Sequence, residues 1–141
     1  MRIDVHADYW TDDYLDLLVD LGKTDTNTQR GMGAGGGAEL DARLRLGSWT
    51  EPECRCRCSP PLRSCPTATT ATRRLRQRFV NDQYAELVAR HPDRFRAFAA
   101  IPMPHVDESI AEMSRALDDL GMVGVDAEHD RARPPAHRGG V

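Results

Sequence analysis

The chain has 141 residues, which is enough for one ordinary domain. Its formal net charge of −3 argues against a nucleic-acid-binding surface spread over the whole chain. There is no apolar run of about 18 residues and no basic-then-apolar secretory leader. We therefore expect no membrane-spanning helix, and a cytoplasmic location.

The first ten residues predict a short strand that ends in a histidine and a carboxylate. Ile3 and Val5 are its apolar positions, and His6 and Asp8 follow. Side chains two residues apart in a strand point to the same side, so His6 and Asp8 are candidate metal ligands. Spacing alone also fits an ordinary strand end, and Asp8 equally fits a solvated loop or a helix cap.

Two helices and a glycine-rich loop are expected next. Residues 11–21 predict a helix capped by Thr11 and ended by Gly22, with an apolar face of Tyr14, Leu17, Leu18 and Leu21. Residues 31–37 are mostly glycine but lack the Gly-Lys-Ser/Thr ending of a phosphate-binding loop, which favours a mobile connection. Residues 38–46 predict a short helix.

Residues 47–77 differ in style from the rest of the chain. They are rich in Arg, Pro and Thr, and they contain four cysteines with the spacing C-x-C-x-C-x₆-C: Cys54, Cys56, Cys58 and Cys65. This spacing is unlike the paired C-x₂₋₄-C of zinc sites. We expect an irregular segment here, with a disordered linker, a metal knuckle and a basic nucleic-acid arm as alternatives. The absence of interleaved aromatic residues weakens the nucleic-acid case.

Regular patterns return from residue 79 onward. Residues 79–90 and 107–120 predict helices, and residues 94–101 and 122–125 predict strands, an alternation typical of a parallel sheet. Val80, Tyr84, Leu87 and Val88 form the buried side of the first helix, and Asp107 is the expected cap of the second. His91 lies at a helix end, where a structural role is expected, and His105 follows the strand at 94–101.

Several blocks of the chain are similar to one known family. They are RIDVHA at 2–7, LDARL at 40–44 and residues 79–124, within which HPDRF (91–95), IPMP (101–104) and LGMVGV (120–125) are the most telling. These blocks resemble the amidohydrolase-related family, in the branch typified by aminocarboxymuconate-semialdehyde decarboxylase. The chain departs from the family at Asp8, which stands where the family has a second histidine. The family's remaining ligands would lie beyond residue 141.

The resemblance implies a fold and a chemistry. The fold would be the N-terminal portion of an α/β structure, the (β/α)₈ barrel, whose active site lies at the carboxyl ends of the strands. The activity would be non-oxidative decarboxylation or hydrolysis of a small carboxylic acid with a divalent metal, usually zinc. His6 and Asp8 would bind the metal and His105 would touch the substrate. A homo-oligomer is compatible with the complete enzyme, and this chain alone is expected to be inactive.

The two irregular segments, 47–77 and 126–141, suggest a shifted reading frame. GC-rich codons read from the third base of the Ser48 codon give MDGAGVQVQVLSPAPQLPY, which is a strand-like sequence. The chain would then divide at these segments: 1–46 and 78–125 would be barrel portions, and 47–77 and 126–141 would be out of frame. The alternative to an enzyme is a non-enzymatic protein that binds a metal or a nucleic acid through the Cys/Arg-rich segment.

Overall fold

The computed structural model describes residues 2–23, 26–27, 30, 38–48, 54–59 and 69–126. For residues 2–8 and 54–59 the description covers the backbone. Within the described residues, no helix is both long enough and apolar enough to cross a membrane.

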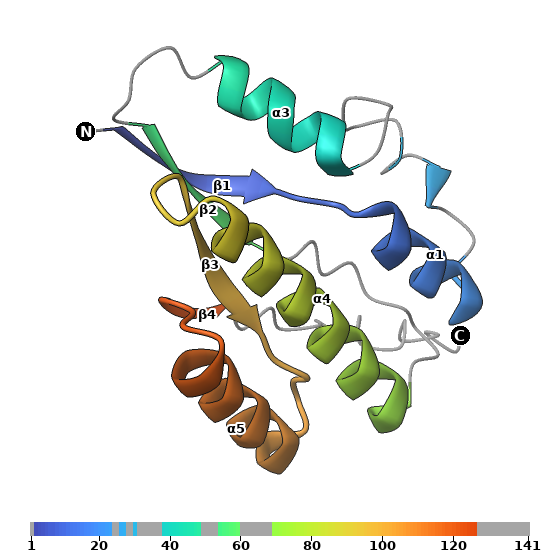
Figure 1. The fold of residues 1–141 in the computed structure, drawn as a ribbon. Coiled ribbons are helices and arrows are strands. Elements are labelled where there is room, and N and C mark those ends of the chain that lie inside the picture. The colour runs from blue at the N-terminus through green and yellow to red at the C-terminus, as the bar shows by residue number, and fades with distance from the viewer. Residues whose placement is uncertain are drawn as a thin grey trace, which may run out of the picture.

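Four parallel strands form one sheet in the order β1-β2-β3-β4 (Figure 1). The strands are β1 (Arg2–Asp8), β2 (Cys54–Ser59), β3 (Phe95–Ala100) and β4 (Gly124–Asp126). Parallel neighbours require a crossover connection, and helices occupy each crossover here. This is the α/β arrangement with strands in chain order that the sequence predicts for part of a barrel.

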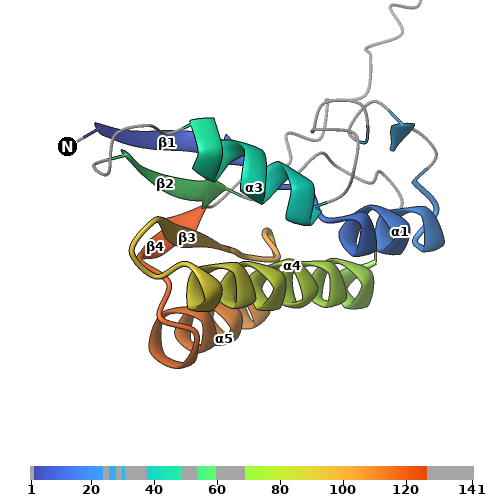
Figure 2. The ribbon, with the colours of Figure 1, turned by 45° about the horizontal axis from the view of Figure 1, so that its top comes forward.

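The helices follow the strands in sequence. The first crossover contains α1 (Asp12–Asp20) and α3 (Ala38–Ser48), and the second is α4 (Thr70–Arg90). The third is α5 (Val106–Ser114), which continues as a π-helical turn, η1 (Arg115–Asp119). Figure 2 shows α4 and α5 on the same side of the sheet.

Helix α1 confirms the pattern predicted from its sequence. The Thr11 hydroxyl caps the helix by accepting a hydrogen bond from the backbone N of Tyr14 at 3.1 Å. Gly22 follows the last turn with φ +89°, a conformation that favours glycine. Tyr14 and Leu18 of the predicted face are buried and Leu17 and Leu21 are half-buried, while Leu15, which the prediction left out, is buried as well.

The expectation of an irregular segment throughout residues 47–77 is wrong at three places, the first being its start, where α3 extends to Ser48. Residues 54–59 form β2, whose backbone pairs with β1 on one side and with β3 on the other. The physical reason is visible in the Cys-Arg-Cys-Arg-Cys run, which alternates with period two and in which cysteine acts as a small apolar residue. Helix α4 also begins at Thr70, before the predicted boundary at residue 78, with Thr69 as its cap.

Helix α4 and strand β3 form the centre of the core. Val80, Tyr84 and Leu87 are each at most 1% exposed and lie in the same cluster as Phe95 and Ala97 of β3. Their spacing in α4 is helical, which confirms the predicted buried side. The Tyr84 hydroxyl also donates a hydrogen bond to the backbone oxygen of Tyr9 at 3.0 Å, which ties α4 to the segment after β1.

Helix α5 differs from its predicted form. His105, rather than Asp107, is its N-cap residue. The buried residues are Ser109 and Glu112 in α5 and Ala116 in η1. The apolar residue Ile110 is 53% exposed. Glu112 makes polar contacts with α4, described below, so a polar side chain rather than that of Ile110 lies on the packed side.

Two glycines mark the entry into β4. Gly121 has φ +64° and ends the helical segment, as the sequence predicts. At Gly124 a Cβ atom would lie 2.5 Å from the Phe98 ring of the neighbouring strand, so the position accepts no side chain without a shift. Asp126 ends β4, and the rest of the predicted tail, 127–141, lies outside the described residues, as does the loop at 31–37. The interpretation of a shifted reading frame stays a prediction.

Candidate active site

The carboxyl ends of the parallel strands meet along one edge of the sheet, where binding sites form in folds of this kind. The end of β1 carries His6 and Asp8, and Asp8 pairs in register with Ser59 of β2. The end of β3 leads into the loop 101–105, which carries His105. The edge therefore holds the three residues predicted for the site.

His6 lies in an irregular part of β1. Asp4 pairs with Cys56 and Ala7 pairs with Cys58, so β1 advances three residues where β2 advances two. The extra residue is a β-bulge at Val5–His6. Bulges are common beside active sites, where they change the direction of a side chain. Strict alternation, on which the joint direction of His6 and Asp8 was predicted, is thus interrupted at His6.

His105 is anchored through its backbone. Its N–H donates to the Pro102 carbonyl at 3.0 Å, and its carbonyl accepts from the Ser109 N–H at 2.9 Å, the first turn of α5. The side chain is half-buried. The loop before it contains a cis peptide bond between Met103 and Pro104. His105 thus joins the end of β3 to the start of α5.

The predicted residues share one edge but come from strands that are not neighbours. Strand β2 separates β1 from β3, so these two strands are roughly 10 Å apart. Within the described residues, no three His, Cys, Asp or Glu side chains are grouped so that they could hold a metal ion. A histidine nitrogen and a carboxylate oxygen suit a divalent metal. The donor types at the end of β1 therefore fit a metal, and their number falls short of a full site.

Among the other candidates from the sequence, His91 lies away from this edge of the sheet. His91 is the C-cap of α4, and its ring centroid lies 5.9 Å from that of Phe95, which agrees with a structural role. Cys54, Cys56 and Cys58 lie within β2 rather than on a free arm. Cys65 lies outside the described residues.

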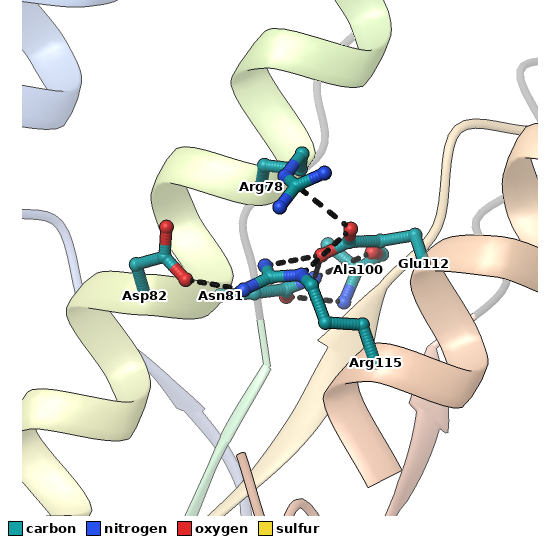
Figure 3. A network of polar contacts seen from close by, with 6 residues as sticks. All are labelled: Arg78, Asn81, Asp82, Ala100, Glu112 and Arg115. Atoms are coloured by element: carbon teal, nitrogen blue, oxygen red, sulfur yellow. Dashed lines mark hydrogen bonds and ion pairs between the residues drawn. The ribbon is translucent and has the colours of Figure 1, made fainter. Parts of the chain in front are cut away.

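A buried polar cluster, which the sequence analysis missed, lies directly behind the end of β3 (Figure 3). The Asn81 side chain, fully buried, donates to the Ala100 carbonyl at 3.0 Å and accepts from the Ala100 N–H at 2.8 Å. Its amide nitrogen also donates to Glu112 at 2.8 Å. Arg115 and Asp82 complete the group. We call these residues the Asn81 cluster: Asn81, Asp82, Ala100, Glu112 and Arg115.

Arg115 pairs with both acidic residues of the Asn81 cluster. Its Nε and one terminal nitrogen donate to the two oxygens of Glu112 at 3.0 and 2.6 Å, and the other terminal nitrogen donates to Asp82 at 2.7 Å. The hydrogen bond to Glu112 is the main reason why the pKa of Arg115 is raised above its usual value. Arg78 adds a weaker ion pair with Glu112 at 3.9 Å. The buried carboxylate therefore has donors on both oxygens.

An open hollow of about 280 Å³ lies beside the cluster, between α4 and α5. Three arginines and three acidic residues line it, namely Arg74, Arg78, Arg115, Asp107, Glu108 and Glu112. The two signs balance, so the hollow favours neither an anion nor a cation. The Asn81 cluster has one sequence signal that could have revealed it: a polar residue, Asn81, beside the apolar positions Val80 and Tyr84.

Curated relatives match parts of the chain. Gamma-resorcylate decarboxylase of Rhizobium radiobacter is 51% identical over 47 residues, which are 33% of this chain and 14% of that protein. The gamma-resorcylate decarboxylase of Polaromonas sp. is 38% identical over 66 residues, 47% of this chain and 20% of that protein. The matches thus span a small share of these relatives.

Solved structures match most of the chain. A dihydroxybenzoic acid decarboxylase from Polaromonas sp., with bound manganese and the inhibitor 2-nitroresorcinol, has a TM-score of 0.60 and 26% identity over 88% of this chain. The match covers 37% of that structure. A model of the amidohydrolase family matches residues 59–138. Since these residues make up more than half of the 141-residue chain, the protein belongs to the amidohydrolase family.

Proposed function

We propose that this chain carries the first part of the active site of a metal-dependent decarboxylase acting on a small hydroxylated aromatic acid. The observation that carries the proposal is the 51% identity to a gamma-resorcylate decarboxylase. The placement of His6, Asp8 and His105 at the carboxyl edge of the sheet supports it. The wider assignment, which includes hydrolysis, rests on the family alone.

His6 and Asp8 are the proposed metal ligands. A bound divalent metal would supply positive charge that polarises an oxygen of the substrate. Manganese is bound in the related Polaromonas decarboxylase and in a 5-carboxyvanillate decarboxylase of Novosphingobium aromaticivorans. Histidine nitrogen and carboxylate oxygen also suit zinc, the metal expected from the sequence. Both metals are therefore to be tested.

His105 is the proposed substrate contact. Its imidazole would hold the carboxylate or a phenolic oxygen of the acid by a hydrogen bond. In the reaction, the bond between the ring carbon and the carboxylate breaks, CO₂ leaves, and the ring carbon takes up a proton. Holding the acid in one orientation lowers the entropic part of the barrier to that step.

Two protein ligands hold a metal weakly, since protein metal sites of this type use three or more. We therefore expect the 141-residue chain alone to bind metal weakly and to show no turnover of 2,6-dihydroxybenzoate. Further ligands would have to come from residues outside the described part.

Manganese titration tests the proposed ligands. Thiolates favour zinc over manganese, so Mn²⁺ followed by electron paramagnetic resonance keeps the cysteines from dominating the result. We expect His6→Ala to weaken Mn²⁺ binding at least about tenfold. The matched control, His91→Ala, removes a histidine away from the strand ends and is expected to leave binding unchanged.

Two outcomes would contradict the proposal. Equal Mn²⁺ affinity of His6→Ala and the unchanged chain would remove His6 from the site. Loss of zinc binding only when the four cysteines are changed to serine would instead support a metal-binding role of the Cys-rich segment.

A further inference from the structure

We infer that Asn81 and Glu112 are positioning residues, which fix the loop 101–105 from both of its ends. The loop matters for function because it carries His105, and in that respect the inference rests on the proposed function. The contacts that carry the inference lie between residues of α4, β3, α5 and η1 (Figure 3).

The start of the loop is fixed by Asn81. Ala100 is the last residue of β3, and both its N–H and its carbonyl bond to the Asn81 side chain, at 2.8 and 3.0 Å. Two opposed hydrogen bonds fix the peptide in distance and in orientation. Asn81 has no exposed surface, so water does not compete for these bonds. The direction in which the chain leaves the strand is thereby set from α4.

The end of the loop is fixed by Glu112. It lies seven residues after His105, about two helical turns along α5, and a rigid helix transmits its position over roughly 10 Å. Glu112 accepts from Asn81 at 2.8 Å, so the same side chain that holds Ala100 also holds α5. Arg115 locks the carboxylate with two further bonds. One cluster therefore controls both ends of a five-residue loop.

The use of buried polar side chains between α4 and α5 indicates a role in fixing the loop position, in addition to stability. A buried carboxylate has a large desolvation cost, and apolar side chains of similar volume would serve packing at least as well. A satisfied polar network instead selects one arrangement, because any shift leaves buried groups unpaired. The network requires a side-chain amide at position 81. Its nitrogen donates two hydrogen bonds, to Ala100 and to Glu112, and its oxygen accepts one from Ala100.

Asn81→Asp tests the inference with little change in shape. Aspartate cannot donate to Ala100 or to Glu112, and it adds a negative charge beside a carboxylate. Because the His105 N–H bonds within the loop, we expect its hydrogen exchange to become about tenfold faster relative to that of Leu15 in α1. The imidazole NMR signals of His105 should also shift in the folded state. The control is Asp118→Asn, a change at an exposed position in η1, which continues α5. It should alter neither the hydrogen exchange nor the imidazole signals of His105.

Glu112→Gln keeps the experiment decisive if Asn81→Asp does not fold. It keeps an acceptor for Asn81 and loses the charge that holds Arg115, so a smaller shift of the His105 signals is expected. A purely structural role would lower the urea midpoint and leave the His105 signals of the folded protein where they are. That result, in either variant that folds, overturns the inference.

Substrate binding is measured separately, so that the two ideas can fail independently. Titration with 2,6-dihydroxybenzoate and Mn²⁺, followed through the His105 signals, addresses the proposed function. No response in the unchanged chain counts against His105 as a substrate contact, whatever the exchange data show. Unchanged His105 signals in Asn81→Asp count against the positioning role, whether or not the acid binds.

Discussion

Arg115 is the residue on which the α4–α5 contact depends most. Its three hydrogen bonds reach Glu112 on its own helical segment and Asp82 on α4. The Glu112 side chain is 5% exposed, so without Arg115 its charge would face a poorly solvated space. The pKa of Arg115 is raised above its usual value, first of all by the hydrogen bond to Glu112, so this contact and the charged guanidinium stabilise each other.

We expect Arg115→Met to lower the free energy of unfolding by about 3 kcal/mol, because it leaves a buried carboxylate without its main partner. Urea unfolding followed by circular dichroism measures the change. Adding Glu112→Leu removes the stranded charge, and the double variant should recover most of the loss. Arg74→Met, exposed on α4, is the control and should stay within about 0.5 kcal/mol. A loss in the double variant as large as in Arg115→Met would contradict this account.

Strand β2 is the element that joins the two halves of the sheet. Cys56 is in register with Asp4 of β1 and with Phe95 of β3, so this one residue is flanked by strands on both sides. An interior strand uses its backbone N–H groups to pair with the strands on both sides, so losing these donors weakens the pairing. The Cys-rich segment is thus a structural part of the sheet at 54–59.

A proline in β2 tests this placement. Cys56→Pro removes the backbone N–H of an interior strand, and we expect a loss of about 3 kcal/mol or more, seen as loss of cooperative urea unfolding. Cys56→Val, which keeps the N–H and favours a strand, is the matched control and should preserve the transition. If both variants unfold like the unchanged chain, residues 54–59 do not contribute to the sheet and an irregular segment is the better description.

At the scale of the whole molecule, one face of α5 and η1 is apolar and open to solvent. Val106, Ile110 and Leu117 are 59, 53 and 37% exposed, at positions that follow helical spacing. Strand β4 is the last strand in the order of the described sheet. Exposed apolar stripes and terminal strands both favour association between molecules.

We expect the double change Ile110→Lys and Leu117→Lys to reduce concentration-dependent association, measured by light scattering and sedimentation. Both side chains are largely outside the core, so the free energy of unfolding should change by no more than about 0.5 kcal/mol. Val19→Lys, at a 48% exposed apolar position on α1, is the control and should leave association unchanged. Equal effects at both places would mean that net charge, rather than this face, governs association.

Elements with a local signal were predictable from the sequence. The cap, acidic first turn and glycine stop of α1 all lie within twelve residues, and β3 shows its alternation directly. The first turns of α4 carry four arginines, Arg73, Arg74, Arg76 and Arg78, and no apolar stripe, so its start at Thr70 was hidden. The packed face of α5 was also hidden, because it is chosen by a distant residue, Asn81.

The position of the candidate site residues in the fold was predictable from the sequence, and their geometry was less so. The strand that bears His6 and Asp8 was visible in the sequence, as was the place of His105 after β3. The bulge at Val5–His6 depends on how β1 pairs with β2, and one chain segment alone carries no sign of it. The contacts of Asn81 depend on where tertiary packing places the Ala100 backbone, which composition and periodicity do not encode.

The hydrogen bond between Tyr84 and Tyr9 has a consequence for synthesis on the ribosome. The two residues are 75 positions apart, whereas Asn81 and Ala100 are 19 apart. At translation rates of about 5–20 residues per second, the segment after β1 waits about 4–15 s before Tyr84 is made. During that interval the apolar side chains of α1 have no α4 to pack against. Of these two helices, α1 would therefore be the first that a chaperone for short apolar segments meets.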